Sequence, residues 1–162
     1  QAKEQCGVGS SETAFNAKIT RLITAARSHV EGYTGMRFGS RAAVMKCDGF
    51  GDFDRLAEAP VTALASISYV DTAGATQTLS TDVYELRADG FETAIVLKYG
   101  QTWPSIQTGS RITVTATVGY ATTEPAVVHA MLLWIADSFA ERESTTSDDF
   151  STLDALLCNH RR

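Results

Sequence analysis

The amino-acid sequence predicts an α+β fold with helices near both ends of the chain and strands between them. Residues 13–35 keep one unbroken apolar period of three and four residues, which is typical of an amphipathic helix. Residues 37–120 are rich in β-branched and aromatic residues, broken by turn residues. A second apolar segment starts at Pro125. We therefore expect one domain, with helices in residues 1–36 and 124–162 around a β region.

The helix expected over residues 13–35 needs a partner. Burying an apolar side chain contributes roughly 1.5–3 kcal/mol, but ordering the backbone costs about 1–2 kcal/mol per residue. Gly35 is expected to end the helix in a left-handed cap, and Ser10 or Ser11 to cap its start. The residues of its apolar stripe are Phe15, Ile19, Leu22, Ile23, Ala26, Val30 and Tyr33.

The β region is expected to form a small antiparallel sheet or barrel. Pro60 suits an edge strand or the start of a strand, and the turn at residues 71–74 predicts a hairpin. The expected strands cover residues 40–47, 56–61, 63–71, 76–79, 83–86, 94–99 and 111–118.

The helix that starts at Pro125 is apolar on more than one face. A proline is well tolerated in the first helical turn, and a helix that is apolar on most sides is buried on most sides. We expect it to pack against the helix of residues 13–35 and to leave surface for another subunit. The residues predicted for that subunit interface are Val127, Met131 and Trp134.

The chain closes with a polar, acidic stretch and a short apolar tail. Residues 143–149 have the composition of a flexible loop. Ser151 can cap a short helix that carries Leu153, Leu156 and Leu157. A helix this short is marginal in water, so exposed leucines on it suggest a docking tail.

Composition excludes several classes of protein. The 162 residues are 44% hydrophobic and carry a net charge of -5, which suits one globular domain and disfavours a phosphate-neutralising surface. The longest apolar run, residues 126–136, is about eleven residues against the roughly 20 that a membrane helix needs. Three widely spaced cysteines fit neither a disulfide framework nor a zinc site, which indicates reduced thiols and intracellular assembly. Gln1 is not an initiator methionine, so we expect preceding residues in the gene product.

No arrangement of residues predicts catalysis, a metal or a cofactor. His29, His129 and His160 are far apart and form no metal-binding motif. The aspartates at 48, 52 and 54 depart from the calcium-loop pattern and favour a solvated turn. Glu141 and Glu143 are two residues apart at a helix end, which favours a solvated face over an acid–base pair.

Trp103 is the remaining candidate. It lies in a loop flanked by glycines, where an aromatic ring can bind a sugar or a base, but more often covers the end of a sheet. An enzyme or a regulatory binding domain with a pocket near Trp103 therefore stays an alternative. A small DNA-binding regulator is disfavoured by the acidic balance.

The order of these segments resembles the head-tail connector (adaptor) proteins of long-tailed phages and gene transfer agents. The resemblance covers nearly the whole chain and depends on order and spacing rather than on one motif. Met36 stands where such proteins often carry a basic residue. The segments are LITAARSHVEGYTG, EAPVTALASISYVDTAGATQTL, TWPS, VTATVGY, a Pro-started helix ending in ERES, and LDALLCNHRR.

The resemblance implies a helical bundle with an inserted small antiparallel β region. It implies a ring of such subunits, a dodecamer, beneath the portal of a capsid assembled in the bacterial cytoplasm. The ring would extend the DNA channel and seat a neck, stopper or tail-completion protein, with no cofactor and no catalytic residue. Portal binding would fall to the C-terminal segment, through Leu153, Leu156, Leu157, Arg161 and Arg162.

Overall fold

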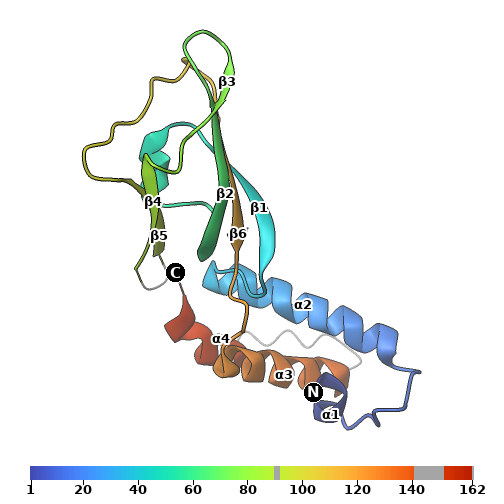
Figure 1. Ribbon diagram of the computed structural model, residues 1–162. Helices are drawn as coiled ribbons and strands as arrows, with labels where there is room; N and C mark the ends of the chain where they lie inside the picture. Colours follow the sequence, from blue (N-terminus) through green and yellow to red (C-terminus); the bar gives the residue numbers. More distant parts are fainter. Residues whose placement is uncertain (90–91, 141–151, 162) are drawn as a thin grey trace. The chain divides into compact units, whose positions relative to one another are not determined.

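The computed structural model describes residues 1–89, 92–140 and 152–161 (Figure 1). The chain divides into two compact units. The helical unit comprises Gln1–Gly35 and Thr122–Arg162, and the sheet unit comprises Met36–Ala121. The elements are α1 (Ala2–Gln5), α2 (Asn16–Thr34), β1 (Arg41–Cys47), the 3-10 turn η1 (Phe50–Asp54), β2 (Val61–Val70), β3 (Thr76–Thr78), β4 (Tyr84–Asp89), β5 (Glu92–Leu97), β6 (Ile112–Val118), α3 (Pro125–Ala140), α4 (Thr152–Leu157) and η2 (Cys158–His160).

The expected helical bundle with a small β insertion is wrong. The fold is α+β, with about as much strand as helix, in a four-stranded antiparallel sheet and a separate two-stranded sheet. The physical reason is that residues 36–121 bury their own hydrophobic core. A segment with its own core is a folding unit in its own right.

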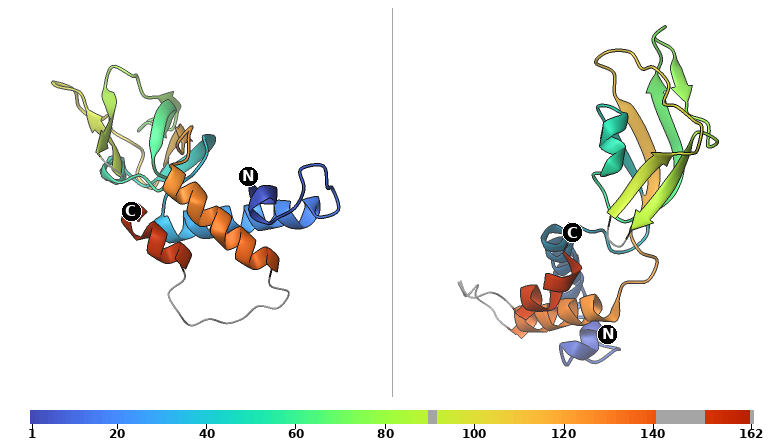
Figure 2. Two further views of the ribbon diagram at one scale, coloured as in Figure 1. Left: turned by 90° about the horizontal axis from the view of Figure 1, so that it is seen from below. Right: turned by 90° about the vertical axis from the view of Figure 1, so that its left-hand side faces the viewer.

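In the helical unit, α2 packs against α3, which confirms the expected partnership of the two helices. Figure 2 shows α3 crossing α2 obliquely. The Phe15 ring meets the Phe139 ring edge to face, with centroids 5.5 Å apart, and Lys18 Nζ donates to the Phe139 carbonyl oxygen at 2.8 Å. None of the helices in the described ranges is both long and apolar enough to cross a bilayer.

The ends of α2 confirm one expectation and correct another. Gly35 ends the helix with φ of 69°, in the left-handed region, as predicted. The expected cap by Ser10 or Ser11 is wrong, because the helix starts later and Phe15 is its N-cap residue without a side-chain hydrogen bond. Between α1 and α2 the chain is instead fixed by Lys3, whose Nζ donates to two carbonyl oxygens of the loop.

The four-stranded sheet has the strand order β1-β6-β2-β3, with every neighbouring pair antiparallel. The β4–β5 hairpin forms the second sheet. The central strand β6 alternates strictly, with Ile112, Val114, Ala116 and Val118 buried and its threonines half-buried. One face of the sheet therefore meets the core and the other does not.

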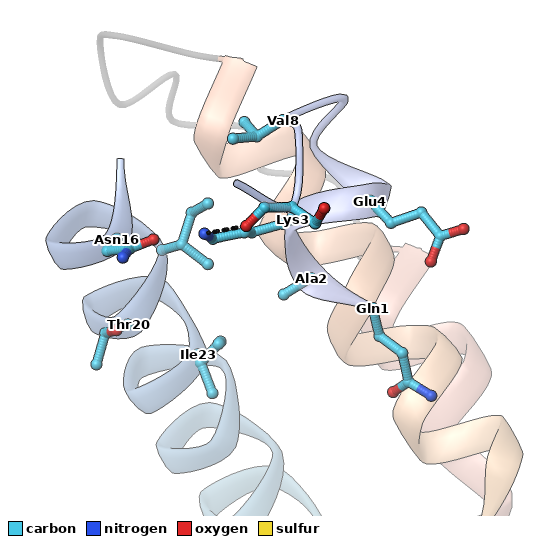
Figure 3. Close-up of a pocket in the computed structure, with 10 residues that line it drawn as sticks. Gln1, Ala2, Lys3, Glu4, Val8, Asn16, Thr20 and Ile23 are labelled. Atoms are coloured by element: carbon cyan, nitrogen blue, oxygen red, sulfur yellow. Dashed lines mark hydrogen bonds between the residues drawn. The ribbon is translucent and has the colours of Figure 1, made fainter. Parts of the chain in front are cut away.

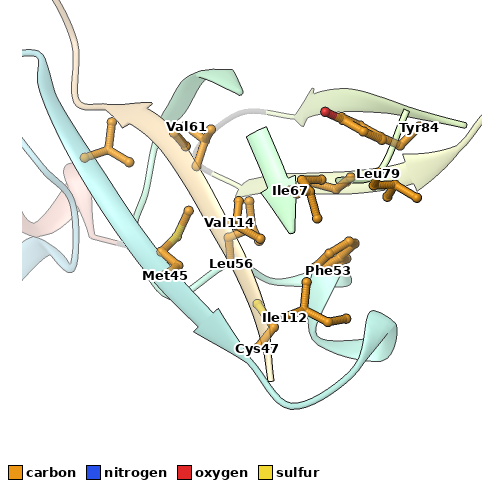
Figure 4. Packing of buried hydrophobic residues seen from close by; sticks show 13 residues of the cluster. Met45, Cys47, Phe53, Leu56, Val61, Ile67, Leu79, Tyr84, Ile112 and Val114 are labelled. Atoms are coloured by element: carbon orange, nitrogen blue, oxygen red, sulfur yellow. The ribbon is translucent and has the colours of Figure 1, made fainter. Parts of the chain in front are cut away.

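The core of the sheet unit lies between the buried face of the four-stranded sheet, η1 and the β4–β5 hairpin (Figure 4). Phe53 of η1 and Ile67 of β2 are completely buried in it. The strand expected at residues 56–61 is wrong: Leu56 and Ala59 are buried in a loop, the Ala59–Pro60 peptide is cis, and β2 starts at Val61. This loop supplies core side chains without joining the sheet.

Candidate functional site

The C-terminal segment, residues 152–161, is held on the helical unit by contacts at both of its ends. At the start of the segment, His29 Nε2 of α2 lies 3.2 Å from Asp154 Oδ1. At its end, His160 Nδ1 lies 3.3 Å from Oε2 of Glu124, the residue before α3. Between them, Leu157 is completely buried. In the first pair the histidine belongs to α2 and the carboxylate to the segment, and in the second the histidine belongs to the segment. These two pairs and the buried Leu157 therefore hold the segment on the helical unit.

The five residues predicted for portal binding differ in their surroundings. Leu156 is 38% exposed, but Leu157 is completely buried and presents no surface. The Arg161 guanidinium lies 5.7 Å from the centroid of the Tyr33 ring, at the end of α2. Leu153 belongs to α4, but its side chain lies outside the described part of the chain, as does Arg162. Portal binding by these residues stays a prediction.

The three residues predicted for the subunit interface all lie on α3. Val127 is completely buried within the helical unit, so it has no surface left for a neighbour. Met131 and Trp134 are half-buried. Leu132 and Ala136 lie on the other side of the helix by its 100° step, and they are half-buried too. The helix therefore shows apolar surface over most of its circumference, and the interface prediction stays untested.

An open groove of about 630 Å³ lies between α1 and α2 (Figure 3). Ala2 and Lys3 line it from α1, and Asn16, Thr20 and Ile23 from α2. The Ile23 side chain is 44% exposed. The lining holds no pair of groups arranged for acid–base or nucleophilic chemistry.

The outer face of the four-stranded sheet is a second surface, which the sequence reasoning missed. We name it the threonine face. The sequence feature that indicates this face is the alternation of threonine with apolar residues in ITVTATV, the segment expected to form a strand. The residues of the face are Ala42, Val44 and Lys46 of β1, Thr113, Thr115 and Thr117 of β6, Ala63, Ser66, Ser68 and Val70 of β2, and Thr76 and Thr78 of β3.

Two of the aspartates near η1 stabilise the turn through hydrogen bonds. Asp52 Oδ2 accepts hydrogen bonds from the backbone N–H of Asp48 and of Gly49, at 2.6 and 3.3 Å. Asp48 Oδ1 in turn accepts from Arg111 Nε at 2.8 Å. Across the described ranges, no group of three or more acidic, histidine or cysteine side chains is placed to hold a metal.

Trp103 packs against the core of the sheet unit. Its ring stacks on Phe50 with centroids 4.7 Å apart and planes 3° apart, and meets Phe53 edge to face at 5.4 Å. The ring thus covers the core, which agrees with the expectation that an aromatic residue in this loop covers the end of a sheet rather than binding a ligand. The other catalytic candidates, Glu141 and Glu143, lie outside the described residues.

No protein-family model and no curated protein matches the sequence. Solved structures do. A chain from the neck of an empty GTA particle, computed with C6 symmetry, is similar at 22% identity and a TM-score of 0.80 over 99% of this chain and 86% of that chain. A chain from the virion of a native gene transfer agent (GTA) particle gives 23% identity and a TM-score of 0.79 over 99% and 86%.

A third similar chain comes from the neck of a native GTA particle computed with C12 symmetry. It is 24% identical, with a TM-score of 0.74 over 90% of this chain and 82% of that chain. These likenesses span both units, so the fold of the whole chain is the fold of these particle chains. The resemblance expected from the sequence is confirmed at the level of the fold.

Proposed function

We propose that this protein is a head-tail connector (adaptor) in the neck of a phage or a gene transfer agent particle. It forms a ring beneath the portal of the capsid, extends the DNA channel and joins the head to the neck or tail. The observation that carries the proposal is the likeness of fold to neck chains over 90–99% of this chain. The role is structural and needs no catalytic residue or cofactor.

The proposed partners are the portal protein, a neck, stopper or tail-completion protein, and further copies of the chain. We assign the portal contact to the C-terminal segment, through Leu153, Leu156, Arg161 and Arg162. Leu157 acts differently: because it is buried, it anchors the segment to the helical unit rather than touching the portal. A ring of twelve copies is supported by the C12 symmetry of one similar neck.

The subunits of the ring contact one another through two different patches, because a cyclic ring uses heterologous contacts. The half-buried residues of α3, Met131 and Trp134 among them, supply one patch. The net charge of -5 suits the wall of a DNA channel, since an acidic lining repels the phosphate backbone and lets it slide. DNA would pass through without sequence-specific binding.

The test is electron microscopy of particles from producing cells that carry only a variant of this chain. Leu156→Glu combined with Arg161→Glu leaves the buried Leu157 anchor in place and changes the proposed portal contact. We expect filled heads without tails. Arg21→Glu, an exposed charge reversal on α2, is the matched control and should give intact particles.

Two outcomes would contradict the proposal. Wild-type particles with no density for this chain at the head vertex would remove the connector role. Intact, infectious particles from the double variant would remove the portal contact but leave the ring.

A further inference from the structure

The threonine face is almost uncharged. Its side chains form rows across the sheet, set by the strand register: Val44 of β1 lies beside Thr115 of β6, which lies beside Ser66 of β2. The next row joins Lys46, Thr113 and Ser68. None of these strand residues carries a carboxylate; past Lys46 the face ends at Asp48, whose Oδ1 accepts a hydrogen bond from Arg111 Nε at 2.8 Å, so this charge is paired.

The face also combines exposure with small, flat side chains. Val44 is 63% exposed, so an aliphatic side chain is available for contact on the edge strand. The threonines lie on the central strand and are half-buried, so their side chains stay partly open to solvent. Each offers a methyl group and a hydroxyl group, so the face can pack closely and still form hydrogen bonds.

Charge identifies the kind of partner that fits. The whole chain carries a net charge of -5, while among the strand residues of the face the charge is that of Lys46, whose Nζ donates to Thr113 Oγ1 at 2.5 Å, and the Asp48–Arg111 pair at the end of the face adds no net charge. A second copy of the chain is acidic, so a carboxylate-free, weakly positive face is where it can approach with the least repulsion. Burying this face also removes no carboxylate from water.

We propose that the threonine face is a contact surface for a neighbouring copy of the same chain. The proposal rests on the ring of the proposed function and names one of its two contact patches. DNA is the less suitable partner, because one lysine neutralises too few phosphates to hold a duplex. The face of one copy therefore packs against a different, acidic surface of the next copy.

The first test is photo-cross-linking in assembled particles. A benzoylphenylalanine residue replaces Val44, which is exposed at the edge of the face, and the matched control places it at Thr72, an exposed residue of the β2–β3 turn. We expect a product of twice the 17.4 kDa chain mass from position 44, at least about tenfold more abundant than from position 72. A cross-link from position 44 to DNA or to another protein would overturn the proposal.

The second test is assembly of substituted chains. Thr115→Glu puts a carboxylate at the centre of the face, and Val44→Glu puts one at its exposed edge. Both should lower the amount of chain per particle at least about tenfold, while Thr72→Glu should not. Circular dichroism of each purified chain checks folding, and Val44→Glu keeps the test decisive if Thr115→Glu misfolds.

The outcomes separate the two proposals. If the wild-type chain is in the neck and both substituted chains assemble normally, the threonine face is not the contact and the connector role stands. If the wild-type chain is absent from particles, the connector role fails and this inference fails with it.

Discussion

Arg37 and Glu58 form a two-bond ion pair in the sheet unit. Arg37 Nη2 donates to Glu58 Oε1 at 2.9 Å, and Nε donates to Oε2. The backbone N–H of Arg37 also donates to the Ala59 carbonyl oxygen at 2.7 Å. These bonds tie the first residues of the sheet unit to the loop before β2. They act next to Met36, which is buried.

Glu58→Gln should lower the free energy of unfolding at pH 7 by about 1 kcal/mol, because a bidentate pair is lost from a partly exposed site. The hydrogen bond from Arg37 holds the pKa of Glu58 below its ordinary value, against an opposing effect of burial. A carboxyl group whose pKa is lowered in the folded state stabilises the fold at pH values above its unfolded pKa of about 4.3. This stabilisation is lost as the pH falls from there through the folded-state pKa.

The difference in the free energy of unfolding between wild type and Glu58→Gln should therefore shrink as the pH falls from about 5 to about 3, the range in which a glutamate ordinarily titrates. Urea unfolding at several pH values measures it. A difference that stays constant down to about pH 3 would show that the charge of Glu58 does not stabilise the fold.

Gly119→Ala should destabilise the sheet unit by more than about 3 kcal/mol. Gly119 has φ of +88°, and an added Cβ would lie 2.4 Å from the Gly39 carbonyl oxygen. Gly74→Ala is the matched control: its φ is +83°, but its Cβ would meet nothing within 4 Å. The control should cost only about 1–2 kcal/mol. Equal thermal melting temperatures for the two variants would contradict the clash.

Leu157→Ala should cost about 2–5 kcal/mol, because it empties a completely buried site. It should also free the C-terminal segment, which limited proteolysis would detect as rapid removal of that segment. Leu156→Ala, four-tenths exposed and one residue away, should cost less than about 1 kcal/mol. Equal protease resistance of Leu157→Ala and wild type would refute the anchoring role.

Cys47 and Cys158 should react with iodoacetamide at different rates. Burial raises the pKa of the Cys47 thiol, and the carboxylates of Asp52 and Asp48 raise it further, so little of it is thiolate. Cys158 is exposed. Mass spectrometry of the native protein at pH 8 should find Cys158 labelled well before Cys47. Labelling of Cys47 at the rate of Cys158 would show that its site opens to solvent.

The helices could be read from the sequence because each depends on local signals. Gly35 and Pro125 mark a stop and a start that need no tertiary partner. The apolar period of α2 and the breadth of α3 then indicated that the two helices meet. The start of α2 was missed, because loop contacts of Lys3 rather than a serine cap fix the preceding chain.

The division of the chain into a helical unit and an independent sheet unit could not be predicted in the same way. Nothing local distinguishes a β insertion from an independent unit, since the difference lies in which side chains meet across long separations. Phe53, expected in a solvated turn, is a core residue of η1, and Leu56, expected in a strand, is a core residue of the loop that follows. The portal leucines and the interface residues were chosen for being apolar, and Leu157 and Val127 prove to be completely buried.

The helical unit is assembled from both ends of the chain, with the whole sheet unit between them. During synthesis on the ribosome, α2 emerges first and must wait for α3 before its apolar stripe is covered. The sheet unit, one continuous stretch, can close meanwhile. A chain cut short before Pro125 would thus keep a complete sheet unit and an α2 whose apolar stripe is uncovered, so nascent chains are most prone to aggregation until α3 has emerged.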